Sequence, residues 1–77
     1  MHRVCVRTAW LPKDVRICLE LEGCTSVGEA IEKALKTVGM EVNLELIAVG
    51  SGKKLVKIDE DVCNYDELQI YRLFHGG

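Results

Sequence analysis

The sequence lacks several features that would direct an interpretation of function. No apolar stretch approaches the ~20 residues needed to cross a bilayer. The start of the chain, Met1-His2-Arg3-Val4, has neither a long apolar segment nor a small-residue cleavage site. We therefore expect no membrane span and no signal peptide. There is also no run of basic residues, and the formal net charge is −2, so nothing favours nucleic-acid binding.

Closely spaced metal ligands are missing as well. The four cysteines are Cys5, Cys18, Cys24 and Cys63, none of them in a Cys-x-x-Cys pair, and the two histidines lie at the extreme ends of the chain. Zinc sites are usually marked by close ligand pairs, so we expect no metal. Without a secretion signal, we expect a cytoplasmic protein with reduced thiols that pack or lie inert on the surface.

The chain also shows no convergent set of titratable residues, so we do not expect an enzyme. What it does contain suits a folded globule: 48% of its residues are hydrophobic and 29% are charged. Its 77 residues allow one small domain, which buries only ~60% of its unfolded surface.

The N-terminal part has the alternation of two half-buried strands. Residues 3–10 and residues 15–21 each alternate apolar and polar side chains, and the segment 11–14 between them, with Pro12, predicts a turn. We expect an antiparallel hairpin with both apolar faces on the same side.

Matching the two apolar faces predicts a register for this hairpin. The expected opposite pairs are Thr8 with Ile17, Val6 with Leu19, and Arg7 with Cys18. In this register Cys5 and Cys18 are diagonal neighbours on the outer face, so we do not expect a native disulfide between them.

A helical period begins at Ser26. The segment Ser26-Val27-Gly28-Glu29 predicts a capping box, and apolar residues at helical spacing follow up to Val38. Gly39 predicts the end of the helix. Gly28 is either tolerated in the first turn or marks a close packing contact.

The C-terminal half returns to strands. We expect strands at 44–49, 55–58 and 67–74, with turns at 51–54 and 64–66, a charged loop at 59–61, and Val62 in the core. In the last strand Leu68 and Ile70 should face inward, and Tyr71 and Leu73 outward.

This order of elements predicts an α+β fold with a mixed four- to five-stranded sheet packed on one helix, since the apolar stripe of the helix must bury against a sheet face. The first and last strands should be parallel neighbours at the centre, because the helix crosses over between them. This is the β-grasp arrangement.

The chain ends on two glycines, Gly76 and Gly77. Without side chains they can lie extended in a channel too narrow for other residues, and they leave the terminal carboxylate of Gly77 sterically open. A frayed terminus is the alternative interpretation.

Taken together, the chain resembles the ubiquitin-like β-grasp superfamily, which includes prokaryotic ubiquitin-like modifiers and the sulfur carriers of thiamine and molybdopterin synthesis. The resemblance covers the whole chain. It rests on the hairpin 4–21, the capped helix 26–38, the segment 47–53, the acidic residues 59–61, and the ending 66–77. It implies a ubiquitin-like domain at 1–74 and a flexible di-glycine tail at 75–77.

The resemblance also implies a role for the tail. In this family the terminal glycine carboxylate is adenylated by a ubiquitin-activating-type enzyme that uses ATP and magnesium. Gly77 would be the residue activated, and Gly76 its slender neighbour. The chain would then be a substrate and carrier that binds no cofactor itself.

After adenylation the family divides. One branch conjugates the glycine to lysines of target proteins, with a conjugating enzyme and an isopeptidase. The other becomes a C-terminal thiocarboxylate, with a sulfurtransferase as partner. The ending 72–77 is closer to that of ubiquitin, although it departs at Phe74 and His75, so we favour the modifier. A non-covalent β-grasp adaptor is the hypothesis from a different class.

A docking surface for the activating enzyme is expected on the last strand. Tyr71 and Leu73 would form an apolar patch with Val49 or Ile47 nearby. Arg72 and His75 are further candidate contacts, although isolated apolar residues are also normal on protein surfaces. We expect a monomer that binds neither nucleic acid nor membrane.

Overall fold

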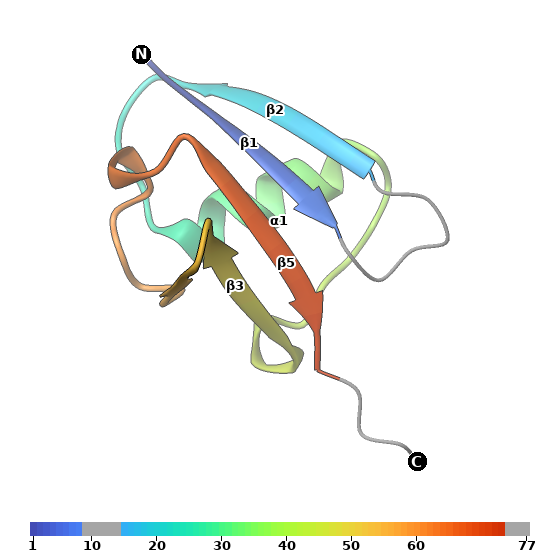
Figure 1. Cartoon of the computed structure of the whole chain (residues 1–77). Coiled ribbons are helices and arrows are strands. Elements are labelled where there is room, and N and C mark those ends of the chain that lie inside the picture. Colours follow the sequence, from blue (N-terminus) through green and yellow to red (C-terminus); the bar gives the residue numbers. More distant parts are fainter. Residues whose placement is uncertain (9–14, 74–77) are drawn as a thin grey trace.

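A computed structural model describes residues 1–8 and 15–73 of the chain (Figure 1). Five strands, one α-helix and two 3-10 turns follow one another along it. In chain order they are β1 His2–Thr8, β2 Val15–Leu21, α1 Val27–Lys36, η1 Leu44–Leu46, β3 Ile47–Ser51, β4 Lys54–Val56, η2 Val62–Asn64 and β5 Glu67–Arg72. No helix in these described ranges is long and apolar enough to cross a membrane.

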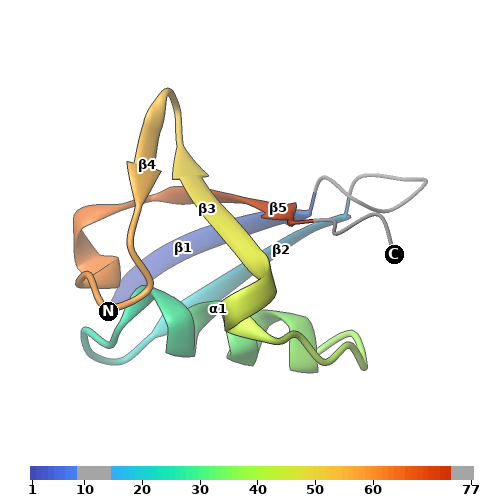
Figure 2. The ribbon, with the colours of Figure 1, turned by 90° about the horizontal axis from the view of Figure 1, so that it is seen from below.

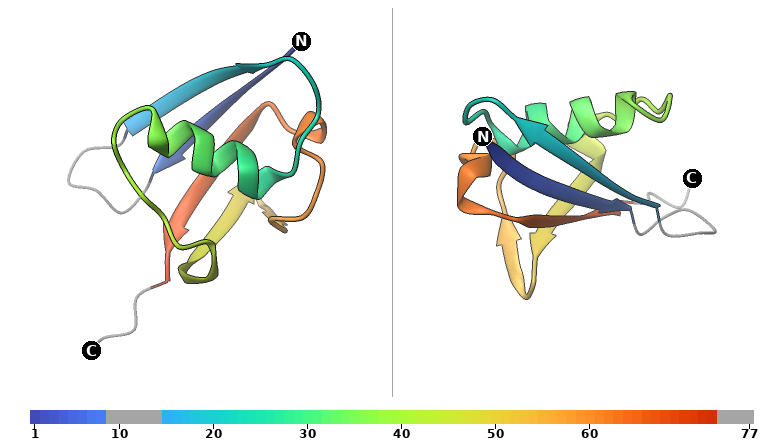
Figure 3. Two further views of the ribbon diagram at one scale, coloured as in Figure 1. Left: turned by 180° about the vertical axis from the view of Figure 1, so that it is seen from behind. Right: turned by 90° about the horizontal axis from the view of Figure 1, so that it is seen from above.

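The strands form one mixed sheet in the order β2-β1-β5-β3-β4. The neighbours β1 and β5 run parallel, and the other pairs are antiparallel. This confirms the predicted α+β, β-grasp-like fold and its central parallel pair. The helix α1 lies across one face of the sheet and leaves the opposite face uncovered (Figures 2 and 3).

The core lies between this sheet and α1. The inward residues of the central parallel pair, such as Val4 and Val6 on β1 and Leu68 and Ile70 on β5, have no exposed surface. The predicted core position of Val62 is confirmed, since it too is fully buried. Because Leu68 and Ile70 are buried between the sheet and α1, only the opposite face of β5 is accessible to other molecules.

The first turn of α1 is capped by Ser26, whose Oγ accepts a hydrogen bond from the Glu29 backbone N–H at 3.2 Å. The reciprocal half of the predicted capping box is wrong. The Glu29 carboxylate does not accept from the Ser26 backbone amide; it accepts from the Thr25 hydroxyl at 2.5 Å. The Ser26 side chain still satisfies one of the free backbone donors at this helix end.

The C-terminal end of α1 lies at Lys36, two residues before the predicted end at Val38. Gly39 has φ +74°, Met40 N–H donates to Leu35 O, and Gly39 N–H donates to Lys36 O. These are the two bonds of a Schellman motif. Val38 lies within this motif and is 48% exposed, so its predicted place in the buried stripe is wrong.

Gly28 is a close packing contact, which was one of its two predicted roles. A Cβ at this position would lie 3.0 Å from Leu44 Cδ1 and 3.3 Å from the backbone oxygen of Ile58. Gly28 N–H also donates to that Ile58 oxygen at 2.8 Å. The absence of a side chain lets the helix approach the segment that follows β4.

Five strand boundaries in the C-terminal half differ from the sequence prediction, including the end of β5, which lies at Arg72 and was expected at residue 74. Residues 44–46, expected as strand, form η1, because the Asn43 side chain caps the Glu45 N–H and Leu46 N–H donates to Asn43 O. The β3–β4 turn is tighter than expected, with Gly52 at φ +62°. Consequently Ser51 and Lys54 are already in the strands, and β4 ends at Val56.

The predicted register of the first hairpin is wrong by two residues. The structure pairs Thr8 with Val15, Val6 with Ile17, Arg7 with Arg16, and Cys5 with Cys18. A shift of two residues leaves every side chain on the same face, so the apolar pattern does not distinguish the two registers. The residues between the strands, 9–14, lie outside the described ranges.

The observed register overturns the expectation that Cys5 stays a reduced thiol. Cys5 and Cys18 lie directly opposite each other, with Cα atoms 3.9 Å apart, and form a disulfide. Cys5 N–H donates to Asp66 O on the other side, so this is a non-hydrogen-bonded pair of the β1–β2 ladder. Side chains are closest at such pairs.

The other two cysteines are bonded as well, contrary to the prediction of reduced thiols. Cys24, just before α1, joins Cys63 in η2, with Cα atoms 5.5 Å apart. The two cysteines are 39 residues apart in sequence, so their spacing did not predict this disulfide. It arises because the chain before α1 lies beside the segment before β5 (Figures 1 and 3).

Candidate functional site on the open sheet face

The uncovered face of the sheet carries Tyr71, one of the residues predicted to dock a partner. Along it, Tyr71 of β5 pairs with Ala48 of β3, and Gly50 of β3 pairs with Leu55 of β4. The ring of Tyr71 lies over Gly50, with Cε2 3.5 Å from the position of a Cβ there. Gly50 thus gives the ring room to lie along the sheet.

These residues form a small apolar surface. Tyr71 is 44% exposed, Leu73 46% and Leu55 74%, and Ala48 is half-buried between them. We call Ala48, Leu55, Tyr71 and Leu73 the outer patch. Exposed apolar groups that lie together are more informative than isolated ones, because contiguous patches mark interaction sites.

Two hydrogen bonds hold the outer patch in place. The Tyr71 hydroxyl donates to Gln69 Oε1 at 2.5 Å, which fixes the ring along its own strand. Leu73 N–H donates to Leu46 O at 2.8 Å, which extends the β3–β5 pairing beyond the end of β5. Tyr71 and Leu73 therefore lie at defined positions.

The structure places Ile47, Val49 and Arg72 away from this surface. Ile47 and Val49 are buried against the helix side, so the prediction that one of them adjoins the patch is wrong; Ala48 takes that place. Arg72 pairs with Ile47, and lines a hollow of about 270 Å³ on that side with the segment 40–43. His75 lies outside the described residues.

Arginines lie beside the outer patch on the same face. Arg7 pairs with Gln69 on one side and with Arg16 on the other, so the two guanidinium groups share a row of the sheet with Gly50 and Leu55. Arg16 Nε reaches across β1 to Glu67 Oε1, at 3.3 Å. The uncovered face is therefore apolar around the outer patch on β3, β4 and β5, and mainly cationic over β1 and β2.

A polar cluster secures the segment between β4 and β5. The Tyr65 hydroxyl donates to Glu60 Oε1 at 2.5 Å, and Lys57 N–H donates to Glu60 Oε2 at 2.7 Å. Lys54 Nζ lies 3.9 Å from Glu60 Oε1 and 5.2 Å from the centre of the Tyr65 ring.

This cluster shifts two titrations in opposite directions. Hydrogen bonding from Tyr65, then from the Lys57 amide, lowers the pKa of the Glu60 carboxyl. Side-chain hydrogen bonding and charge interaction with Tyr65, and attraction to Glu60, raise the pKa of Lys54. All three side chains hold the loop, which makes the cluster a structural one.

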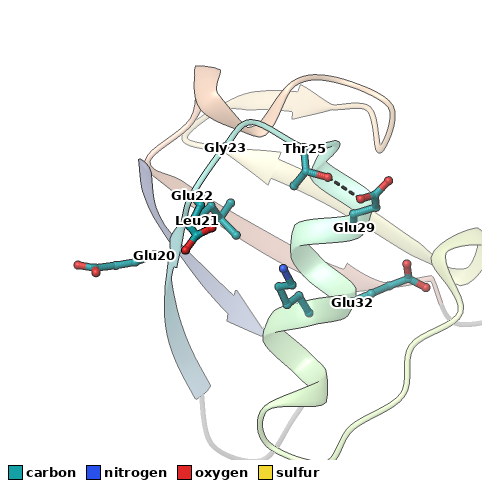
Figure 4. A pocket seen from close by; sticks show the side chains of 8 residues that line it. Glu20, Leu21, Glu22, Gly23, Thr25, Glu29 and Glu32 are labelled. Atoms are coloured by element: carbon teal, nitrogen blue, oxygen red, sulfur yellow. Dashed lines mark hydrogen bonds between the residues drawn. The ribbon is translucent and has the colours of Figure 1, made fainter. Parts of the chain in front are cut away.

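A hollow of about 450 Å³ lies between the end of β2 and the first half of α1 (Figure 4). Its polar lining is dominated by carboxylates: Glu20, Glu22, Glu29 and Glu32, with Lys33 as the cation. The Thr25 hydroxyl donates to Glu29 here (Figure 4). The negative charge favours cations near this edge of the molecule.

One group of side chains in the described residues has the donor types of a metal site. Ligand atoms of Cys24, Asp61 and Cys63 lie within 4.8 Å of one another. Sequence spacing missed the group because Cys24 is far from the other two along the chain. The pair Asp61 and Cys63, two residues apart, was the only local signal.

β5 is the last strand before the di-glycine pair in the sequence. This strand lies between β1 and β3 at the centre of the sheet and runs parallel to β1. Gly76 and Gly77 follow it and lie outside the described residues, so the expected activation site and the 74/75 domain boundary stay predictions.

No protein-family model matches the chain. No curated protein matches it either.

Proposed function

We propose that this chain is a ubiquitin-like protein modifier. The carboxylate of Gly77 is adenylated by a ubiquitin-activating-type enzyme with ATP and magnesium, and is then conjugated to lysine amines of target proteins. The observation that carries the proposal is the combination of a β-grasp-like sheet, with β5 at its centre, and a Gly76-Gly77 pair just beyond that strand.

The chemistry needs little from the chain itself. A carboxylate is a poor electrophile, and adenylation gives it a good leaving group. Gly76 and Gly77 fit a narrow channel because they have no side chains. The chain is therefore the substrate of this reaction and not its catalyst, and the adenylating enzyme holds the ATP and magnesium.

The outer patch supports a docking role for the domain. Tyr71 lies on β5 and Leu73 directly follows this strand, so an enzyme bound to them is close in sequence to the residues it must activate. Aromatic side chains are strong anchors of protein interfaces. The neighbouring Arg7 and Arg16 complement a partner with an acidic border.

We place this activity in the cytoplasm, where the activating enzyme has ATP and the chain acts as a monomer. Cytoplasmic thiols keep most disulfides reduced. In that compartment Cys5–Cys18 and Cys24–Cys63 would be open for much of the time, and the hydrogen bonds and core described above would hold the fold.

The sulfur carrier is the second candidate, because the tail departs from that of ubiquitin at Phe74 and His75. It shares adenylation of Gly77 but then exchanges a terminal oxygen for sulfur. A conjugating enzyme and an isopeptidase are the partners in the first case, and a sulfurtransferase in the second.

The test is to express the chain with an N-terminal epitope in its native host and to blot for heavier species. The wild type should give a ladder, and both deletion of Gly77 and Gly76→Ala should remove it. Gly23→Ala is the matched control, because Gly23 has open space around it and no positive φ. A ladder that persists without Gly77 overturns the proposal.

A further inference from the structure

We propose that, once its disulfide is reduced, the Cys24–Cys63 pair binds a thiophilic divalent cation of the zinc type together with Asp61. The ligand atoms of these three residues lie within 4.8 Å of one another in the oxidised chain. Two thiolates and a carboxylate are a donor set that zinc accepts, with water in the remaining position. The proposal does not depend on the proposed function.

The backbone holds the three ligands together independently of the disulfide. Val62 N–H donates to Thr25 O at 2.9 Å, and Val27 N–H donates to Glu60 O at 2.8 Å. Ser26 and Asp61 also form an antiparallel bridge between the same two segments. These bonds begin at Thr25, directly after Cys24, on one segment and flank Asp61 on the other, so we expect the two thiols to stay close together after reduction.

Asp61 is oriented toward this group. Its Oδ1 accepts a hydrogen bond from Cys63 N–H at 2.9 Å, as the cap of η2. This bond fixes the carboxylate beside the Cys63 side chain and leaves its second oxygen for a cation. Outer hydrogen bonds of this kind orient metal ligands in proteins.

The surroundings admit a cation and attract it. Cys24 and Asp61 are exposed and Cys63 is half-buried, so an ion can reach all three from solvent. The two neighbours of Cys24, Gly23 and Thr25, line the carboxylate-rich hollow beside α1 (Figure 4). Opposite charge near a site raises the local concentration of the ion.

The site exists only in the reduced chain. A dithiol reductant transfers two electrons and two protons to the Cys24–Cys63 bond and becomes a disulfide itself. The two cysteine S–H groups then lose their protons to solvent as the metal–sulfur bonds form. A disulfide oxidant that accepts two electrons, and is itself reduced to two thiols, re-forms the Cys24–Cys63 bond, which removes both thiolate ligands and releases the ion.

Co²⁺ is the probe, since its thiolate complexes absorb in the near ultraviolet and it takes the geometry of zinc sites. The full chain is reduced with a phosphine, which becomes the phosphine oxide by taking oxygen from water. Amide NMR spectra check the fold before Co²⁺ is added. We expect one thiolate-bound Co²⁺ per reduced chain, displaced by Zn²⁺, and none in the oxidised chain.

Three variants locate the site. Cys5→Ser/Cys18→Ser is the matched control and should bind Co²⁺ as the wild type does. Cys24→Ser/Cys63→Ser should lose binding. Asp61→Asn keeps the cap of η2 through its amide oxygen but loses the charge, and should bind at least tenfold more weakly.

Several results would overturn the proposal. These are the absence of Co²⁺–thiolate absorption in the reduced wild type, equal binding by the oxidised chain, or loss of binding in Cys5→Ser/Cys18→Ser. If Asp61→Asn bound Co²⁺ with unchanged affinity, Asp61 would not be a ligand of the ion. Should Cys24→Ser/Cys63→Ser fail to fold, the comparison of oxidised with reduced wild type still decides the matter.

Discussion

Cys24 and Cys63 are 39 residues apart in sequence, yet a disulfide joins them at a Cα separation of 5.5 Å. The bond ties the entry of α1 to η2 at one end of the sheet. The second bond, Cys5–Cys18, closes a shorter loop of sequence separation 13 within the β1–β2 hairpin. Both loops restrict the unfolded chain, the longer one more strongly.

Removing each bond should therefore destabilise the oxidised domain by different amounts. The loop-closure relation predicts a loss in the free energy of unfolding of about 4 kcal/mol for Cys24→Ser/Cys63→Ser and about 3 kcal/mol for Cys5→Ser/Cys18→Ser. Urea unfolding measures both. In the presence of a phosphine reductant, the wild type and both variants should have similar free energies of unfolding. If the differences remained unchanged under these conditions, the loss of stability would come from packing and not from loop closure.

Gly28→Ala should destabilise the domain although alanine is the better helix former. The new Cβ would lie 3.3 Å from the Ile58 oxygen and 3.0 Å from Leu44 Cδ1. Overpacking costs about 1–3 kcal/mol, and the gain in helix propensity is about 1 kcal/mol. We expect a net loss of about 1 kcal/mol in thermal or urea unfolding. Gly23→Ala, with open space around it, should stay within about 0.5 kcal/mol of wild type; equal stabilities of the two variants would contradict the contact.

The Glu60–Tyr65 hydrogen bond makes stability depend on acid pH. Because the pKa of Glu60 is lowered in the folded state, its contribution is complete above the ordinary value of 4.5 and is lost as the pH falls through the folded pKa. In Tyr65→Phe, the pKa of Glu60 measured by carboxyl NMR titration should rise toward 4.5. An unchanged titration would show that Tyr65 is not the main cause.

Lys54 has the opposite dependence. Its pKa is raised in the folded state, so its contribution is complete below the ordinary value of 10.5 and is lost as the pH rises through the folded pKa. Tyr65→Phe should lower the pKa of Lys54 in ammonium NMR titrations. An unchanged pKa of Lys54 in Tyr65→Phe would show that Tyr65 is not the main cause of the shift.

The outer patch should contribute to recognition by the activating enzyme. In ATP–pyrophosphate exchange with that enzyme, Tyr71→Ala should raise the chain concentration at half-maximal rate about tenfold or more, as loss of an aromatic anchor does. Val38→Ala is the matched control, since Val38 is 48% exposed and belongs to the helix side. If Tyr71→Ala and Val38→Ala required the same chain concentration for half-maximal rate, the outer patch would not contribute to recognition by the enzyme.

Much of the fold follows from periodicity. The alternation in β1, β2 and β5 and the apolar stripe of α1 specify which faces are buried, so the sheet, the helix and the central parallel pair were predictable. The short segment 44–46 was not, because its apolar residues suit a strand and a single side-chain cap from Asn43 made it a 3-10 turn.

The disulfides and the candidate metal group were harder to foresee. A two-residue shift of the hairpin preserves the apolar pattern but moves Cys18 from the position opposite Arg7 to the position opposite Cys5. The contact of Cys24 with Cys63 depends on how two loops meet in space. The face carrying Tyr71 was predicted correctly, whereas its neighbour is Ala48 and not Ile47 or Val49.

The modifier proposal makes its most direct prediction about target lysines. Trypsin cuts after Arg72, so a lysine conjugated to Gly77 keeps the branch Leu73-Phe74-His75-Gly76-Gly77. Mass spectrometry of tryptic digests from the native host, with intact-mass analysis of the free chain, should find this branch on lysines of other proteins and an unmodified carboxylate at Gly77. A free chain in which sulfur replaces one terminal oxygen, with no branched peptides, would contradict the modifier and establish the sulfur carrier. An unmodified chain with no branched peptides would contradict both and leave the adaptor.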